Sequence, residues 1–268
     1  MNWLKTVPLS LFTVVFLVGS FDASAADPSA SDIAQKSYDS SKVADSTSDA
    51  TFKLVNSAGQ ERIRETTGGT KLIKGTTDNM RITTFMSPSD VKGTKTLLIE
   101  HTGKDDDIWI YLPALKKVRR LVSNNKKDSF VGTDFSYGDV IGHRPSDWNH
   151  KIVKSESVDG RDCFVLESTP KTPEVANNSG YSKRVFWIDK ENFVPLKGEV
   201  YDSGNQLLKK FTAKRIEKVD AKNDKWQPMY LEAENVQSNH RTILEFKNFK
   251  ANLGIDNDKF TTRYLEIQ

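Results

Sequence analysis

The residues in this chain that could carry out catalysis do not form a recognisable catalytic motif. No G-x-S-x-G nucleophile elbow is present, and the histidines show no H-E-x-x-H or comparable pairing. They are His101, His143, His150 and His240. The single cysteine, Cys163, excludes an intramolecular disulfide and a cysteine-rich metal site, and its strand-like surroundings predict a small buried residue. We therefore expect no catalytic residues, no metal and no cofactor.

Two groups of carboxylates could bind a cation or hold a loop. Asp105, Asp106 and Asp107 follow one another, but without the ordered ligand spacing and glycine of an EF-hand loop. Short acidic runs of this kind are common in turns, so we expect them to be solvated rather than to bind a metal. Asp134 and Asp139 lie among aromatic residues. We expect these two to accept backbone N–H hydrogen bonds that hold a loop in shape.

The overall charge gives no sign of a nucleic-acid partner. The chain has 39 basic and 36 acidic residues, a formal net charge of +3. A local basic excess lies around Val118, formed by Lys116, Lys117, Arg119 and Arg120. One interpretation is an exposed edge strand whose lysines prevent edge-to-edge aggregation. The other is a surface that docks to an acidic partner or to anionic lipid headgroups.

Large apolar and aromatic residues could instead line a cavity for a lipid. A groove of such side chains holds acyl chains without covalent chemistry, since each buried methylene contributes about 0.8 kcal/mol. The alternative is that these residues fill an ordinary core. The candidates for the cavity and its lid are Phe52, Leu54, Ile82, Phe85, Trp109, Tyr111, Phe130, Phe135, Tyr137 and Trp187. Gly132 and Gly138 flank the aromatic loop, and we expect them to act as hinges of the lid.

Strand patterns predict the scaffold that must position these residues. Ile108 to Tyr111 are four β-favouring residues in succession, and Pro113 ends them because it cannot donate to a sheet ladder. Asp159-Gly160 predicts a tight hairpin turn. Ten or more short strands, with turn residues between them, indicate one continuous antiparallel sheet. A sheet of this size curls, and we expect an N-terminal helix and the 113–144 region to cover its concave face.

The N-terminus has the pattern of an export signal. Lys5 precedes an apolar stretch at 9–18, and Ala23-Ser24-Ala25 provides an A-x-A cleavage site. The stretch is shorter than the roughly 20 residues of a membrane-spanning helix, which favours cleavage over a membrane anchor. The chain thus divides into a cleaved signal peptide at 1–25, an N-terminal segment with a short helix at 26–49, and a single domain at 50–268. We expect the mature protein in the periplasm.

Two motifs in the middle of the chain resemble the LolA-like outer membrane lipoprotein-sorting proteins. The first is W-x-Y-L-P-A-L-K-K-V-R-R, beginning at Trp109, and the second is S-F-x-G-T-D-F-S-Y-x-D, beginning at Ser129. Upstream, residues 59–65 and the P-S-D-V-K-G turn at 88–93 resemble that family's first hairpin and turn. Thr133 and Gly138 depart from the family pattern, in which a serine and an acidic residue are common. The matching motif residues are Trp109, Tyr111, Leu112, Pro113, Phe130, Gly132, Asp134, Phe135, Tyr137 and Asp139.

The resemblance implies a mainly β (α+β) fold, in which a large curled antiparallel sheet forms an unclosed β-barrel. Its concave hydrophobic face would be covered by a few helices and a loop. The resemblance also implies a periplasmic carrier that moves lipids or lipid-modified proteins between membranes, with acyl chains as ligands and an RND/MMPL-type exporter as its inner-membrane partner.

Two other functions stay open at this point. One is a lipid-sensing regulatory binding module on the same fold. The other is a periplasmic hydrolase, which would need an acid–base set that the sequence does not display.

Overall fold

Thirteen antiparallel strands form one sheet in the computed structural model, which describes Met1 and residues 28–267. The predicted signal peptide, apart from Met1, lies outside the described residues. The strands of the first half are β1 (Asp45–Val55), β2 (Glu61–Leu72), β3 (Asn79–Ser87), β4 (Lys95–Ile99), β5 (Asp107–Leu112) and β6 (Lys117–Leu121). Those of the second half are β7 (Trp148–Val158), β8 (Arg161–Pro170), β9 (Lys183–Asp189), β10 (Pro195–Tyr201), β11 (Leu207–Asp220), β12 (Lys225–Asn235) and β13 (His240–Ala251).

The order of the strands leaves the sheet unclosed. It is β6-β5-β4-β3-β2-β1-β13-β12-β11-β10-β9-β8-β7, so the first and last strands of the chain pair in the middle of the sheet. β6 and β7 form the two edges, although they follow each other in sequence. The chain between them must therefore pass from one edge to the other, and it packs over the concave face as it does so. The predicted curled antiparallel sheet, forming an unclosed barrel, is confirmed.

Helices are few and short in the described part of the chain. The α-helices are α1 (Ala30–Asp39), α2 (Tyr137–Ile141), α3 (Pro173–Ser179) and α4 (Thr262–Glu266). The 3-10 helices are η1 (Pro113–Leu115), η2 (Ser123–Lys127), η3 (Phe130–Gly132), η4 (Pro145–Asp147) and η5 (Asn257–Phe260). None of the described helices has the length and hydrophobicity to cross a bilayer.

Local sequence explains where several elements begin and end. β5 ends at Leu112 because Pro113 opens η1. Asp159 and Gly160 both have positive φ, 51° and 79°, as the tight turn between β7 and β8 requires. Both features confirm the sequence predictions.

The N-terminal helix α1 covers one end of the concave face, as expected. It begins with a capping box in which Ser29 Oγ accepts a hydrogen bond from the Asp32 amide at 3.2 Å. Its buried residues Ile33 and Ala34 pack against Phe164 and neighbouring residues of β8 and β9. β1 begins at Asp45, and residues 45–49 pair with β2, so the sheet starts before the boundary expected at residue 49.

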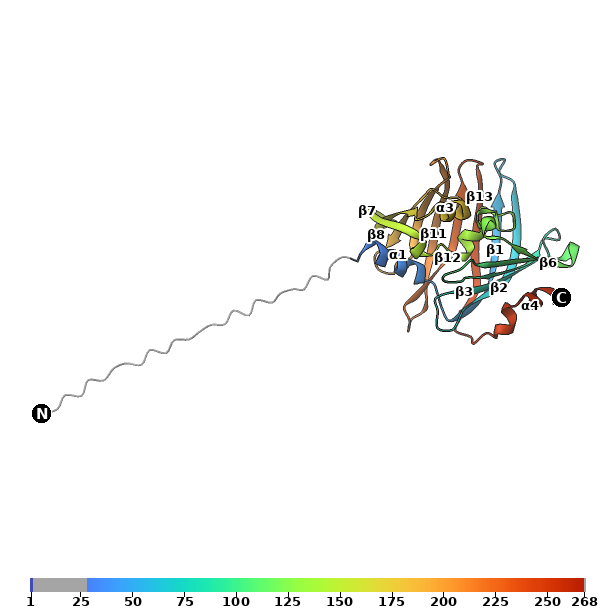
Figure 1. The fold of residues 1–268 in the computed structure, drawn as a ribbon, viewed down its shortest axis with the longest axis horizontal. Helices are drawn as coiled ribbons and strands as arrows, with labels where there is room; N and C mark the ends of the chain where they lie inside the picture. The colour runs from blue at the N-terminus through green and yellow to red at the C-terminus, as the bar shows by residue number, and fades with distance from the viewer. Residues whose placement is uncertain (2–27, 268) are drawn as a thin grey trace.

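The two faces of the sheet are covered by different segments. On the concave face, Phe52, Phe85 and Leu98 pack against the connection between β6 and β7. On the outer face, α4 and η5 place Phe260 and Leu265 against strands β3 to β6, near the C-terminal end of the chain (Figure 1). Because both faces of the sheet are partly covered, the strands do not alternate regularly between apolar buried residues and polar exposed residues.

Candidate binding cavity

The connection between the two edge strands contains an aromatic loop at residues 128–142, the lid loop, which fills one half of the concave face. The ring of Phe130 lies 6.3 Å from Phe52, 6.1 Å from Phe85 and 5.4 Å from Tyr137, centroid to centroid. Phe135 lies 6.1 Å from Phe211 of β11. Six residues predicted for the cavity and lid therefore come together in one inner cluster, namely Phe52, Leu54, Phe85, Phe130, Phe135 and Tyr137.

The other four candidates pack on the outer face, which corrects the expectation that their side chains line the concave surface. Trp109, Tyr111 and Ile82 pack with the cluster beneath α4, although Ile82 also borders the cavity. Trp187 packs with Cys163 and Val165 in a second outer cluster. The buried Cys163 agrees with its prediction as a small core residue. Alternation separates two sets of side chains, but which set faces inward depends on the register with neighbouring strands.

Two neighbouring cavities remain between the sheet and its covering segments. The first has a volume of about 300 Å³ and lies among β1, β2, β3 and the lid loop. The second has a volume of about 350 Å³ and lies over β8 to β11 beneath α1. Phe135, Gly142 and Leu231 border both, so the two form adjoining compartments. Volumes of this size are typical of small-molecule sites.

The second compartment is predominantly apolar. Phe186 and Phe211 are stacked with ring centroids 6.2 Å apart. Gly198 makes this possible, because a Cβ there would lie 2.3 Å from an atom of the Phe186 ring. The apolar lining consists of Leu166, Phe186, Ile188, Leu196, Val200 and Phe211. Phe186 and Ile188 thus take the inward positions that we had expected for Trp187.

The first compartment has a charged end that sequence reasoning did not predict. Lys42 Nζ lies 2.7 Å from Glu100 Oε2, and the Tyr38 hydroxyl donates to the same oxygen at 3.0 Å. Burial lowers the pKa of Lys42, while Glu100 opposes that shift. Burial also raises the pKa of Tyr38, and the Glu100 charge adds to the effect. Arg81 of β3 borders the same space. In the sequence, the charged residues within the strand patterns at 79–87 and 95–100 could have indicated this charged end of the compartment.

Asp139 fastens the lid loop to the other half of the sheet. Its carboxylate accepts hydrogen bonds from the Ser136 amide at 2.8 Å and the Tyr181 hydroxyl at 2.9 Å. Lys209 of β11 lies 3.3 Å away. Burial by itself would raise the pKa of Asp139, but Lys209 and His143 hold it well below its usual range. The expected backbone contact is confirmed, and the buried ion pair adds to it.

Asp134 fastens the lid loop to β13 through side chains rather than through backbone amides. Its carboxylate accepts a hydrogen bond from Thr242 Oγ1 at 2.7 Å, and His240 Nδ1 lies 2.6 Å from the same oxygen. The prediction of bonds from backbone N–H groups was therefore wrong for Asp134. Its structural role as a loop anchor agrees with the expectation.

The proposed glycine hinges differ from each other. Gly132 has a φ of +75°, a left-handed conformation that favours glycine. Gly138 lies inside α2, where a Cβ would be 3.2 Å from the Lys126 carbonyl oxygen. Close packing therefore explains Gly138, and only Gly132 has the backbone freedom of a hinge. Next to Gly132, the carbonyl oxygen of Val131 accepts a hydrogen bond from Arg64 of β2.

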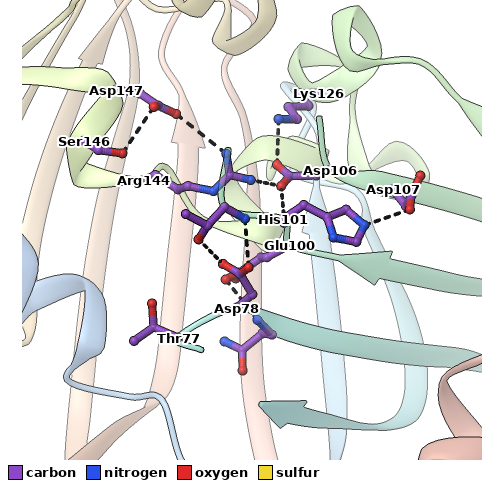
Figure 2. A network of polar contacts seen from close by, with 12 residues as sticks. Thr77, Asp78, Glu100, His101, Asp106, Asp107, Lys126, Arg144, Ser146 and Asp147 are labelled. Carbon is purple, nitrogen blue, oxygen red and sulfur yellow. Dashed lines mark hydrogen bonds and ion pairs between the residues drawn. The ribbon is translucent and has the colours of Figure 1, made fainter. Parts of the chain in front are cut away.

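A polar network closes the rim beside the first compartment (Figure 2). Asp106 is buried and pairs with Arg144 and with Lys126, the latter at 2.6 Å. Asp107 lies 2.8 Å from His101 Nε2. The prediction of a solvated turn at 105–107 is wrong for Asp106, because the distant Lys126 and Arg144 neutralise it. The described residues contain no group of His, Cys, Asp and Glu suited to a metal.

The basic residues at 116–120 lie at one edge of the sheet. Lys117, Arg119 and Arg120 are exposed on edge strand β6, and Lys116 precedes it with a φ of 48°. This placement agrees with the exposed edge strand of the first interpretation. Within residues 28–267, Lys116, Lys117 and Arg119 form no ion pair and suit the docking interpretation, whereas Arg120 pairs with Asp107.

One serine–histidine contact in the cavity wall bears on the hydrolase alternative. Ser168 Oγ lies 2.8 Å from His150 Nδ1, and His150 Nε2 lies 2.9 Å from the Pro145 carbonyl oxygen. The two residues are cross-strand partners on β7 and β8. β8 pairs on both sides, so its backbone N–H groups are engaged in ladders rather than available as an oxyanion hole. This arrangement favours a structural pair over a nucleophile.

Comparison with solved structures identifies relatives of this fold. An outer membrane lipoprotein-sorting protein domain from Vibrio parahaemolyticus is 31% identical with a TM-score of 0.81, over 89% of this chain and 98% of that one. A DUF1329 family protein from Desulfovibrio piger is 28% identical with a TM-score of 0.81, over 88% and 97%. A LolA superfamily protein from Nitrosomonas europaea shares the fold at 20% identity and a TM-score of 0.67, over 88% and 98%.

Searches of curated proteins and of protein families give the following. No curated protein matches the chain. A model of a family described as "Uncharacterized protein" matches residues 77–267. Together with the Vibrio parahaemolyticus match, which spans nearly all of both chains, this shows that the protein belongs to the family of LolA-like outer membrane lipoprotein-sorting proteins.

Proposed function

We propose that the mature protein is a periplasmic carrier that binds the acyl chains of lipids or lipid-modified proteins and moves them between membranes. The observation that carries this proposal is the pair of adjoining cavities beneath the lid loop. The proposal includes removal of the signal peptide at 1–25, after which the remaining chain acts as a single carrier domain. N-terminal sequencing of the exported protein should begin at Ala26, and retention of residues 1–25 would contradict this part.

The energetics of an acyl ligand suit such a carrier. A 16-carbon chain taken from water gains roughly 10 kcal/mol on burial, at about 0.8 kcal/mol per methylene. Release then requires that the closed lid be only a few kcal/mol more stable than the open one, or that a partner binds the open form. The lid loop is held by side-chain contacts of Asp134, Asp139 and Arg64. Such contacts are separable without breaking the strand ladders.

The proposed partner is an inner-membrane transporter of the RND/MMPL type. The exposed cations Lys116, Lys117, Arg119 and Arg120 at edge strand β6 would dock to its acidic surface or to anionic headgroups beside it. Reversing Lys117 and Arg119, which form no ion pair within residues 28–267, to glutamate should abolish photocrosslinking of the periplasmic protein to the transporter, and unchanged crosslinking would remove this surface from the proposal.

Native mass spectrometry of the mature protein, purified from the periplasm without detergent, tests the carrier function. We expect a co-purifying acyl species at near-stoichiometric amount, which organic extraction would identify. A clean apo mass, together with no uptake of added phospholipid or lipopeptide, would overturn the proposal. The cavities would then be too constricted for lipid.

A lipid-sensing regulatory module is the second candidate on the same cavity. A carrier releases its bound lipid to acceptor vesicles, whereas a sensor keeps the lipid and changes its affinity for a protein partner when loaded. Transfer of a fluorescent phospholipid from the loaded protein to vesicles separates the two, and we expect transfer.

A further inference from the structure

Arg81 is a cation on the concave face of β3 that has no carboxylate paired with it. Its cross-strand partner Leu98 belongs to the inner cluster, which places Arg81 on the same face, and it borders the first compartment. Within residues 28–267, no carboxylate oxygen lies within the 4.0 Å that defines an ion pair with its guanidinium. Burial lowers the pKa of Arg81, and Glu100 opposes this through charge alone.

The two carboxylates that line this compartment, Glu100 and Asp139, already pair with other cations. Glu100 pairs with Lys42 at 2.7 Å, and the side chains of both are almost completely buried, at 4% and 7% exposure. The Asn79 amide also donates to Glu100 Oε2, at 3.1 Å. Asp139 pairs with Lys209. Arg81 is therefore left without a paired carboxylate, although the buried Asp78, which is hydrogen-bonded to Thr102, adds negative charge near Lys42.

Arg184 is the comparable cation of the second compartment, but its surroundings differ. Its guanidinium lies 3.8 Å over the ring of Trp148, a distance typical of a cation–π contact. Asp139 and Asp147 also stabilise its charge from nearby. Arg184 therefore has partners within the protein, whereas Arg81 has no ion-pair or cation–π partner among residues 28–267.

The floor of the compartment beside Arg81 offers hydroxyl groups and room. Thr83 lies two residues further along β3 and so on the same face. Thr83, Gly68 and Ser48 are neighbours in one row across β3, β2 and β1. Gly68 carries no side chain, and a Cβ there would lie 2.3 Å from the Ile82 carbonyl oxygen. An anion beside Arg81 would thus meet hydroxyl donors and no bulky side chain.

Another part of the lining of the same compartment is apolar. Phe52 of β1 and Leu231 of β12 line it from the sheet and Phe130 lines it from the lid loop, and beyond Phe135 the apolar second compartment begins. A ligand that fits both ends is an amphiphile with a negatively charged head. The planar guanidinium fork matches two oxygens of a phosphate, and the hydroxyls can serve a third.

We propose that Arg81 binds the phosphate headgroup of an acidic acyl lipid, whose tails occupy the apolar parts of the two compartments. This inference rests on the proposed carrier function and specifies its substrate class. The charged end of the cavity would then select the lipid by its headgroup. The apolar part would bind the acyl tails equally well whatever the headgroup.

Two fluorescent lipids with identical tails test the proposal on the purified mature protein. Pyrene-labelled phosphatidic acid carries the phosphate, and the matched diacylglycerol lacks it. We expect phosphatidic acid to bind about tenfold more tightly, as a charge-assisted hydrogen-bonding group does. Arg81→Gln should lose about tenfold in affinity for phosphatidic acid and leave diacylglycerol binding unchanged. Arg241→Gln is the matched control, because it removes the same charge from an exposed position on β13.

The outcomes separate this inference from the carrier function. Equal binding of both lipids, with no effect of Arg81→Gln, would overturn the role of Arg81 while the carrier function stands. Binding of neither lipid would overturn both. Calorimetric titration with inorganic phosphate distinguishes a free anion from a headgroup. We expect no binding, and phosphate binding that Arg81→Gln abolishes would overturn the lipid assignment.

Should Arg81→Gln fail to fold, Arg81→Lys provides a second test. It keeps the charge but loses the two-pronged geometry. It should lower the preference for phosphatidic acid over diacylglycerol, and an unaltered preference would overturn the guanidinium–phosphate contact.

Discussion

The carboxylate of Asp139 accepts a hydrogen bond from the Tyr181 hydroxyl at 2.9 Å, although the two residues are 42 positions apart. Lys209 of β11 donates to the same tyrosine oxygen at 3.2 Å and lies 3.3 Å from Asp139. Asp139 lies on α2 within the lid loop, whereas Tyr181 lies two residues before the start of β9. These three residues therefore join the lid loop to the half of the sheet that carries the apolar compartment.

Replacing Asp139 by asparagine should destabilise the protein by about 3 kcal/mol, because Lys209 would remain buried without its counter-charge. The free energy of unfolding in urea measures the change. Asp159→Asn is the control, since Asp159 is exposed in a hairpin turn and asparagine tolerates the same positive φ. The double variant Asp139→Asn, Lys209→Met should lose less than the sum of the single variants. Additive losses would show that the two side chains do not interact.

Stability should fall as the pH is lowered from neutrality, because His143 is buried without charge. Burial, and next the charge of Arg184, lower its pKa from 6.5 to about 4, although Asp139 opposes the shift. Between these values the unfolded chain binds more protons than the folded one. The contribution of His143 is therefore complete above pH 6.5 and is lost towards pH 4, at up to about 1.4 kcal/mol per pH unit.

Urea unfolding between about pH 7 and about pH 4.5 measures this slope. His143→Gln should reduce the dependence of the unfolding free energy on pH. His150 contributes to the dependence that remains, because burial also lowers its pKa. Parallel curves for the native protein and the variant would contradict the assignment to His143.

The left-handed backbone at Gly132 should distinguish alanine from asparagine. Gly132→Ala should cost about 1 kcal/mol of stability, because a Cβ is unfavourable at a φ of +75°. Gly132→Asn should cost less, since asparagine adopts this region more readily. The same two variants should slow lipid exchange in the same order if Gly132 is a hinge of the lid loop. Equal unfolding free energies for both would argue against backbone strain at this position.

Adjacent residues of β9 should affect stability alike and lipid binding differently. Phe186 faces the apolar compartment, and Trp187 packs in the outer cluster with Cys163 and Val165. Each alanine variant should lose about 3–5 kcal/mol of stability. Only Phe186→Ala should change the affinity for a fluorescent acyl lipid, measured at a temperature where both variants are folded. An equal change in affinity for Trp187→Ala would mean that the outer face also binds lipid.

Local sequence was sufficient for the fold class and for the position of the lid. Pro113 ends a strand, and Asp159-Gly160 forms a tight turn, because both effects depend on the conformations available to one or two residues. Phe130, Phe135 and Tyr137, spaced within eight residues, indicated a loop folded over an apolar surface, and they pack there. The order of the motifs carried the family resemblance along most of the chain.

Only the tertiary structure decided which face of each strand lines the cavity. Alternation predicted two sets of side chains, but the pairing of β4 with β5 and the packing of α4 place Trp109 and Tyr111 outside. The sequence around Asp106 indicated a solvated turn, because nothing nearby in the sequence shows that Arg144, 38 residues away, pairs with it. Arg81 likewise gained its significance from the pairing of Lys42 with Glu100, 58 residues apart. Charge balance inside a cavity is a property of the assembled sheet, which no single stretch of sequence contains.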